Sequence, residues 1–222
     1  MIYLFKRWLK KRVSRDSLVW RTATTVSAVV FYPRTLYRRY SRSSIFNFES
    51  EMDMCSLFPQ GLLDEAIRIF QPRSVLDLGC GTGRSLEYFH ERGIDVFGLE
   101  GSELAISKAA HPELIRKVDL NHEVQLRRKF DLVWSYEVVE HIHPDYVQSL
   151  MRTFSNHGDN VVLSAARPGQ GGQGHFNEQP PEYWIARFAE HGYTCDQDAT
   201  RRLRAVPEEF SANMLAFRRS VG

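Results

Sequence analysis

Residues 75–84 read Val-Leu-Asp-Leu-Gly-Cys-Gly-Thr-Gly-Arg. The apolar start of this stretch is typical of a buried β-strand, and a helix-like pattern follows its glycines. Glycine suits a loop whose backbone turns sharply and comes close to a ligand, because it has no Cβ that would clash. A helix N-terminus after such a loop offers unpaired N–H groups to an anionic or polar ligand. The stretch therefore predicts a loop that binds a nucleotide-type cofactor.

The spacing of the glycines indicates which cofactor this is. A dinucleotide-binding loop has the pattern G-x-G-x-x-G/A, in which the third small residue lets the helix pack against the strand. Here the glycines fall at positions 79, 81 and 83, and Arg84 stands where that pattern needs a small residue. The spacing therefore disfavours NAD and FAD. A second predicted strand ends at Glu100, at about the 20-residue distance from Asp77 at which an acid binds ribose hydroxyls.

The G-x-G-x-G loop led by Asp77 resembles motif I of class I S-adenosylmethionine-dependent methyltransferases, and the resemblance extends through most of residues 72–195. It implies a Rossmann-like fold and S-adenosyl-L-methionine as the cofactor. In this family an acid at the place of Glu100 holds the ribose, and an acid at the place of Asp119 bonds the adenine amino group. Asp119 can also be a simple turn residue. The implied cofactor-binding residues are Asp77, Gly79, Cys80, Gly81, Gly83, Glu100, Gly101, Asp119, Leu120, Tyr136 and Glu137.

Past residue 50, short strand patterns alternate with helical patterns, which predicts a doubly wound α/β fold with helices on both faces of a mostly parallel sheet. Ligands of such sheets bind outside the carboxyl ends of the strands. The family resemblance implies that the last two strands form an antiparallel hairpin, giving seven strands in total. The expected strands are 74–78, 95–99, 114–118, 131–135, 160–164, 193–195 and 214–218, and the expected helices are 55–70, 83–91, 102–109, 145–154 and 181–190.

Charge divides the chain into two parts. Residues 1–42 hold eleven of the 29 basic residues and one of the 27 acidic residues, so this part carries +10 and the remainder −8. We therefore expect a basic amphipathic extension and linker over 1–48 and a methyltransferase domain over 49–222. A cationic helix with Trp and Phe can lie at a membrane surface, follow a nucleic-acid backbone, or pack its apolar side on the domain.

Three cysteines form neither a Cys-x-x-Cys pair nor an even-numbered set, which favours a reducing cytoplasm. The apolar part of the N-terminal region is too short and too interrupted for a membrane span, and it lacks a signal-peptide cleavage pattern. We therefore expect a cytoplasmic protein whose basic extension places it at the inner face of the membrane.

Glu137-Val138-Val139-Glu140-His141 would, in a helix, place two carboxylates and an imidazole on one face. Such a set, with His175 from the loop 169–178, suits Mg or Mn. The segment is similar to the metal site of small-RNA 3′-end 2′-O-methyltransferases and of ubiquinone-biosynthesis O-methyltransferases. This resemblance implies a cation that binds substrate hydroxyls and lowers their pKa. In the metal-free alternative, Glu140 lies at a helix start and His141 lines the pocket.

Residues 174–180 read Gly-His-x-Asn-x-Gln-Pro, and Tyr183-Trp184 follow on a predicted helix. This pattern resembles bacterial methyltransferases of surface-glycan and lipid-linked sugar biosynthesis. We therefore expect O-methylation of a sugar or lipid-linked glycan, with His141 and His175 as catalytic residues; His175 can instead cap the helix start. RNA 2′-O-methylation and a non-catalytic, cofactor-binding regulator are the alternatives, and the acidic domain makes a nucleic-acid partner less favourable.

Overall fold

The structure is a computed structural model that describes residues 45–220. The predicted basic helix, and its membrane, nucleic-acid or domain contacts, lie mostly in residues 1–44 and therefore outside the described part of the chain. Among the described residues, no helix is both long and apolar enough to cross a membrane.

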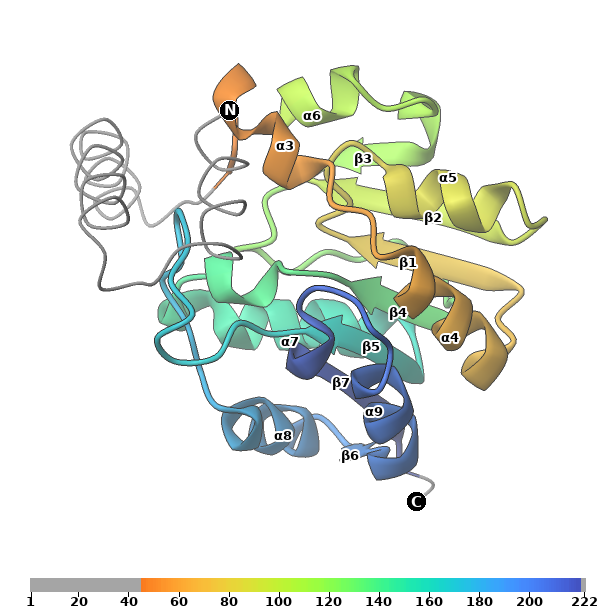
Figure 1. The fold of residues 1–222 in the computed structure, drawn as a ribbon, viewed down its shortest axis with the longest axis vertical. Helices are drawn as coiled ribbons and strands as arrows, with labels where there is room; N and C mark the ends of the chain where they lie inside the picture. The colour runs from red at the N-terminus through yellow and green to blue at the C-terminus, as the bar shows by residue number, and fades with distance from the viewer. Residues whose placement is uncertain (1–44, 221–222) are drawn as a thin grey trace.

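A seven-stranded sheet forms the centre of the molecule (Figure 1), with the order β3-β2-β1-β4-β5-β7-β6. Strands β1 to β5 run parallel, while β7 runs antiparallel to both β5 and β6. The predicted doubly wound sheet with a C-terminal hairpin is thereby confirmed. The strands are β1 (Ser74–Leu78), β2 (Asp95–Glu100), β3 (Ile115–Lys117), β4 (Leu132–Ser135), β5 (Asn160–Ser164), β6 (Tyr193–Cys195) and β7 (Met214–Arg219).

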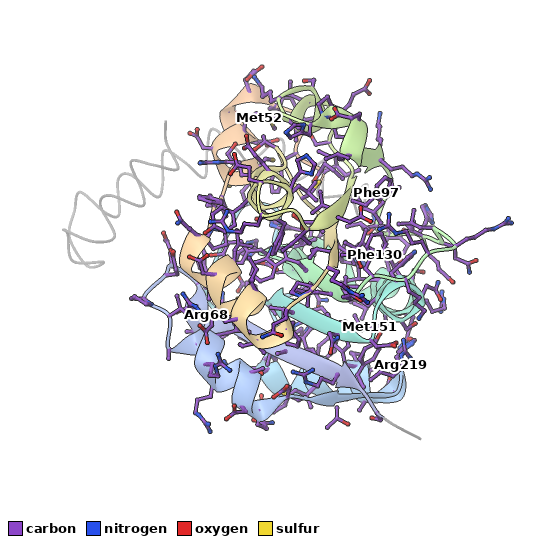
Figure 2. The ribbon with its side chains drawn as sticks, turned by 90° about the vertical axis from the view of Figure 1, so that its right-hand side faces the viewer. Met52, Arg68, Phe97, Phe130, Met151 and Arg219 are labelled. Atoms are coloured by element: carbon purple, nitrogen blue, oxygen red, sulfur yellow. The ribbon has the colours of Figure 1, made fainter. Side chains whose placement is uncertain are left out.

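Helices cover both faces of this sheet and enclose two hydrophobic cores. Because side chains alternate along a strand, Val75 packs with one core and Leu76 with the other. The first core contains side chains of α4 (Gln60–Phe70), α5 (Arg84–His90) and α9 (Gln197–Arg204), and Ile106 of α6 (Glu103–Ser107) packs against it. The second contains side chains of α7 (Val147–His157) and α8 (Pro181–Glu190). Figure 2 shows Arg68 of α4 and Met151 of α7 on different sides of the sheet.

Two helical predictions need correction. The helix expected over 55–70 is two helices, α3 (Met52–Cys55) and α4, with Pro59 directly before the second. A residue before proline is driven out of the helical region, so the chain leaves the helix before Pro59. The helix α9 was not predicted, because its sequence is short and polar; Asp196 caps it by accepting from the Ala199 amide at 2.9 Å. Short 3₁₀ helices cover Glu49–Glu51, Pro112–Leu114, Val139–His141, Pro144–Tyr146 and Ser211–Asn213.

Candidate active site

The glycine loop follows β1 at the carboxyl edge of the sheet. Gly79, Gly81 and Gly83 have φ values of 75°, 56° and 76°, which residues with a side chain rarely adopt. A Cβ at Gly81 would lie 2.1 Å from the Cys55 carbonyl oxygen, so this position has no room for a side chain. The loop is thus mostly buried, and the Cys55 carbonyl and the Val138 side chain lie directly against its backbone.

Two acids stand beside this loop at the ends of neighbouring strands. The Glu100 carboxylate accepts hydrogen bonds from the Gly81 amide at 2.8 Å and the Ser102 amide at 2.7 Å. Burial raises the pKa of Glu100, against the effect of these hydrogen bonds. Asp77 is 2% exposed, and burial, with a smaller effect from the charge of Glu100, raises its pKa well above its usual value. Both groups can accept hydrogen bonds from ligand hydroxyls.

The other residues predicted to bind the cofactor lie in varied surroundings. Asp119 follows β3 and accepts from the Asn121 amide at 3.0 Å, which is the turn role left open above. Leu120 packs into the second core. Tyr136 follows β4, and its hydroxyl donates to the Glu209 carbonyl at 2.7 Å. A Cβ at Gly101 would lie 2.9 Å from the Ile45 side chain. Their roles toward a cofactor stay predictions.

A second group of polar side chains forms where the loops after β4 and β5 meet. One ligand atom each of Glu140, His141 and His175 lies within 4.8 Å of the others. The Glu140 side chain is fully buried, and neither carboxylate oxygen makes a hydrogen bond of normal geometry, although the Ala166 amide and the Glu137 carboxyl group lie close to it. Burial, and next the charge of Glu137, raises the pKa of Glu140 well above its usual value. We call these three residues the Glu-His cluster.

Both imidazoles of the Glu-His cluster are oriented through their Nδ1 atoms. His141 Nδ1 lies 3.1 Å from the Gly174 carbonyl oxygen, and His175 Nδ1 lies 2.8 Å from Glu178 Oε1. A carbonyl or carboxylate only accepts, so in each neutral ring the proton is on Nδ1 and the lone pair is on Nε2. Metal-ligating histidines are commonly held in this way, with the far nitrogen donating to an oxygen.

Glu137 lies close to Glu140 but is not among the three candidate ligands, and no helical face places it there. Its φ of +53° interrupts any helix, and the 3₁₀ turn begins only at Val139. Its carboxylate accepts from Asn213 Nδ2 at 3.1 Å and from Gln170 Nε2 at 3.0 Å. Ser164 Oγ, at the end of β5, accepts from the Glu137 amide at 2.5 Å. The helical interpretation of 137–141 is therefore wrong, because contacts with distant segments fix the backbone at its first residue.

Sequence reasoning missed Glu178, which organises the loop that carries His175. Besides contacting His175, its carboxylate accepts from the Gly169 amide at 2.9 Å and from the Gly171 amide at 2.7 Å. A Cβ at Gly172 would lie 2.2 Å from His175 Nε2, so glycine is required there. The sequence signal that was available for Glu178 is its position a few residues after a glycine-rich loop, where a carboxylate can accept from backbone amides.

Sequence reasoning also missed residues 45–58, here called the covering segment, which contact both groups of polar residues. The Phe46 ring packs edge-on against the His141 ring at 5.0 Å between centroids, and the Phe46 carbonyl accepts from Ser102 Oγ. Farther along, the Thr82 amide donates to the Cys55 carbonyl at 2.8 Å. Glu51 accepts from Gln173 Nε2 at 2.7 Å. The covering segment thus joins the glycine loop to the Glu-His cluster.

Comparison with known sequences gives partial matches. A family described as "Methyltransferase domain" matches residues 51–203. The ubiquinone biosynthesis O-methyltransferase of Rhodopseudomonas palustris (strain BisB5) is 32% identical over 75 residues, which are 31% of this chain and 30% of that protein. A probable S-adenosyl-L-methionine-dependent methyltransferase, TehB of Haemophilus influenzae (strain 10810), is 27% identical over 130 residues, or 53% of this chain and 44% of that protein. The matched stretches span less than half the length of these relatives.

Solved structures share the fold at low sequence identity. The sugar N-methyltransferase KedS8 from Streptoalloteichus sp ATCC 53650 aligns with a TM-score of 0.57 and 17% identity, over 83% of this chain and 93% of that one. DesVI of Streptomyces venezuelae aligns with a TM-score of 0.57 and 17% identity, over 72% of this chain and 93% of that one. These likenesses concern the fold. The family match, by contrast, covers more than half of the sequence, and the chain therefore belongs to the methyltransferase-domain family.

Proposed function

We propose that the chain is an S-adenosyl-L-methionine-dependent O-methyltransferase that acts on a hydroxyl of a sugar or lipid-linked glycan with the help of a divalent cation. The Glu-His cluster is where we place the cation. The observation that carries this proposal is the Glu140 carboxylate, which is fully buried and whose two oxygens make no hydrogen bond of normal geometry. Buried polar groups are almost always satisfied, and an unpartnered buried carboxylate is costly.

For the cofactor, the supporting features are the glycine loop and its neighbouring acids. Three glycines of the loop take left-handed backbone conformations, and the carboxylates of Asp77 and Glu100 lie beside the loop. Carboxylates accept hydrogen bonds from ribose hydroxyls, as the second-strand acid does in dinucleotide-binding folds. We therefore place the ribose of the cofactor at Glu100.

The donor set of the Glu-His cluster fits a divalent cation. One carboxylate and two imidazole nitrogens make a mixed oxygen and nitrogen set, which suits Mn better than Mg. Three protein ligands leave coordination positions for an acceptor. When bound, the cation would act as a Lewis acid that lowers the pKa of an acceptor hydroxyl. His141 and His175 can ligate it through Nε2, because their Nδ1 atoms are held by Gly174 and Glu178.

In the reaction, the methyl carbon leaves the sulfonium sulfur and bonds to the acceptor oxygen, while the hydroxyl proton leaves to a base. Alignment of the acceptor with the methyl group supplies much of the acceleration. Should the cluster act without a cation, His175 Nε2 is the base that the geometry favours. Glu178 then stabilises the imidazolium through its contact with Nδ1.

Support for the acceptor class comes from the relatives and from charge. One matched relative is named as an O-methyltransferase, and one structural neighbour is named as a sugar N-methyltransferase, which supports the sugar but not the oxygen. The part of the chain after residue 42 carries −8, which disfavours acceptors rich in phosphate. Anchoring at a membrane by residues 1–42 would bring the enzyme to lipid-linked acceptors, and this remains part of the proposal.

Calorimetry on the full chain tests the proposal. We expect S-adenosyl-L-methionine to bind, and Mn²⁺ to bind in a separate event that disappears with a chelator and in Glu140→Gln. Release of S-adenosylhomocysteine from radiolabelled cofactor would then be measured with glycan and RNA acceptors. Absence of cofactor binding would overturn the whole proposal. Cofactor binding without a Mn²⁺ event would overturn the metal-assisted mechanism.

A further inference from the structure

Two arginines, here called the arginine pair, lie close together where β5 ends and β7 begins. Arg167 follows β5, and its Nη2 group donates to the Ala212 carbonyl. Arg204 is the last residue of α9, and its Nε group donates to the Met214 carbonyl at 2.9 Å. A residue spans at most about 3.6 Å of chain, so the two accepting residues are at most about 7 Å apart. One short segment therefore anchors both guanidinium groups at the carboxyl edge of the sheet.

The part of the chain that the structure describes offers the arginine pair no ion pair with an acid. Burial lowers the pKa of Arg204, and the charge of Arg167 is the next largest cause. The charge of Glu182 opposes this effect but ranks below that of Arg167. The Cys195 thiol also acts on Arg204, but burial raises the pKa of this thiol, so it is neutral at pH 7. Two arginines and one glutamate give a local charge of +1, although the chain after residue 42 carries −8.

Each guanidinium of the arginine pair also has a nitrogen whose hydrogen bonding is incomplete. Arg167 Nε and Arg204 Nη2 are buried and have no hydrogen-bond partner within the described chain. An arginine cannot lose its proton to relieve this cost, because its guanidinium stays charged in proteins. The Nη1 group of each half-buried side chain is accessible to solvent. An anion at the two Nη1 groups would offset the charge that burial leaves uncompensated.

A phosphate group suits the arginine pair better than a carboxylate does. A carboxylate has two oxygens, and a single guanidinium can bind both of them bidentately. A phosphate monoester has three free oxygens, so it can accept hydrogen bonds from two guanidinium groups at once. Arginine is the side chain best suited to such planar, charge-assisted recognition of phosphate. The pair therefore favours a phosphate over a carboxylate.

Both segments that carry or anchor the arginine pair also contact the acids after β4. Ala166, directly before Arg167, has its amide close to the Glu140 carboxylate. Asn213, between the two accepting carbonyls, donates from Nδ2 to the Glu137 carboxylate at 3.1 Å. The arginine pair is thus one residue along the chain from two contacts with these acids.

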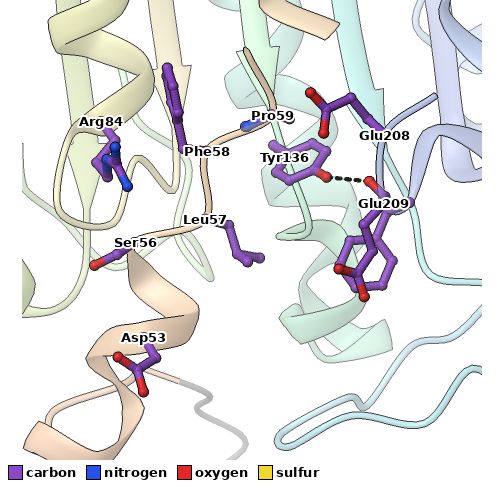
Figure 3. Close-up of a pocket in the computed structure, with 10 residues that line it drawn as sticks. Asp53, Ser56, Leu57, Phe58, Pro59, Arg84, Tyr136, Glu208 and Glu209 are labelled. Carbon is purple, nitrogen blue, oxygen red and sulfur yellow. Dashed lines mark hydrogen bonds between the residues drawn. The ribbon is translucent and has the colours of Figure 1, made fainter. Parts of the chain in front are cut away.

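We propose that the arginine pair is a binding site for a phosphate group with three free oxygens, which accepts hydrogen bonds from both guanidinium groups. The site goes beyond the proposed function, because it requires neither a methyl acceptor nor a cation. It is also distinct from the cavity of about 380 Å³ in Figure 3, whose lining includes Arg84 but neither residue of the pair. A phosphate bound here would link the chain after β5 to the start of β7.

The test is proton–nitrogen NMR of the arginine Nε–H groups in the full chain. A bulk binding measurement would not suffice, because residues 1–42 hold eleven basic residues that also attract phosphate. Methyl phosphate, inorganic phosphate and acetate are titrated separately at constant ionic strength. We expect the Arg167 and Arg204 signals to shift to saturation with one shared Kd, and acetate to bind at least about tenfold more weakly. Tighter binding of methyl phosphate than of inorganic phosphate would assign the site to an ester, and the reverse to the free ion.

Arg167→Gln and Arg204→Gln are each measured through the signal of the remaining arginine. Each should raise the Kd of methyl phosphate at least about tenfold, and one folded variant is enough for the test. Arg201→Gln is the matched control, because it removes the same charge from an exposed position of α9 where Asp198 is the partner. It should leave the Kd unchanged.

The inference is overturned if neither signal shifts, if the shifts do not saturate, or if acetate binds as tightly as methyl phosphate. It is also overturned if Arg201→Gln weakens binding as much as Arg167→Gln does. Calorimetry of the same samples with S-adenosyl-L-methionine and Mn²⁺ tests the proposed function separately, so the failure of one proposal is distinguishable from the failure of the other.

Discussion

Glu100 at the end of β2 and Glu140 after β4 are both carboxylates at the carboxyl edge of the sheet, and burial raises the pKa of each. Their partners differ. Glu100 accepts from two backbone amides with normal geometry, whereas neither oxygen of Glu140 makes such a hydrogen bond. The first arrangement is complete without a ligand, and a polar ligand would exchange hydrogen bonds with it. The hydrogen bonding of the buried Glu140 carboxylate is incomplete, and a bound cation would offset the free-energy cost of burying this group.

The largest effect expected from this comparison is that of Glu140→Leu. Methyl transfer should fall at least about 100-fold, because a Lewis acid contributes several kcal/mol to the transition state. The metal-free protein should nevertheless gain about 1–3 kcal/mol in free energy of unfolding, since the substitution removes a buried unpartnered carboxylate. Radiolabel transfer and denaturant titration measure the two effects.

Glu137→Leu is the control for that stability gain. Its carboxylate accepts from Asn213 and Gln170, so the same substitution removes two hydrogen bonds and leaves these amide groups bonded only to each other. It should lower the free energy of unfolding. A stability loss in both variants would show that Glu140 is an ordinary buried polar residue.

Glu100→Ala should have the next largest effect, on cofactor binding. Loss of charge-assisted hydrogen bonds to ribose hydroxyls, worth about 1.5–3 kcal/mol, should raise the Kd of S-adenosyl-L-methionine about 10- to 100-fold in calorimetry. The Mn²⁺ affinity should stay the same, because Glu100 is outside the Glu-His cluster. Equal weakening of both ligands would indicate a general disturbance of the sheet edge.

Glu178→Gln should have a smaller effect, confined to the Glu-His cluster. The variant weakens the contact that orients His175, and we expect the Kd of Mn²⁺ to rise about tenfold. The amides of Gly169 and Gly171 should also exchange faster with solvent, because they donate to the same carboxylate. Glu182→Gln on the exposed side of α8 serves as control. Unchanged Mn²⁺ affinity would contradict this positioning role.

The smallest effect concerns a buried group far from both carboxylates. His157 Nε2 accepts from the Leu126 amide at 2.9 Å and its Nδ1 contacts the Thr153 carbonyl at 2.6 Å, so the ring is neutral. Burial lowers the pKa of His157 below the usual value of about 6.5. Its contribution to stability is therefore present above about pH 6.5 and is lost as the pH falls through the folded-state pKa. Denaturant titrations at pH 7 and 5 on wild type and His157→Gln measure this; an equal pH dependence in both would contradict it.

Much of the fold was predictable because local signals agreed with the tertiary structure. The bounds of β1 and β5 match the expected ranges, since apolar runs bounded by turn residues mark buried parallel strands. Local sequence signals failed to predict the conformation where contacts with distant residues determine it. Ser164 and Asn213 hold Glu137 away from the expected helical face, and no local pattern indicates either contact.

The candidate site was predictable in its residue types more than in its geometry. His175 was expected near Glu140 and His141, and the structure brings these three together. Glu178 was missed because its importance comes from three simultaneous contacts within a loop. The cavity shown in Figure 3 combines residues from positions 53 to 210, and such a combination exists only after folding.

The covering segment has a kinetic consequence. Phe46 contacts both Ser102 beside the glycine loop and His141 of the Glu-His cluster, while Cys55 is bonded to the glycine loop itself. With the cofactor placed at Glu100 as proposed, its product would leave past this segment, and these contacts would have to separate and re-form in every catalytic cycle. We therefore expect detachment of this segment, not methyl transfer, to set the turnover rate, with a pre-steady-state burst as its signature.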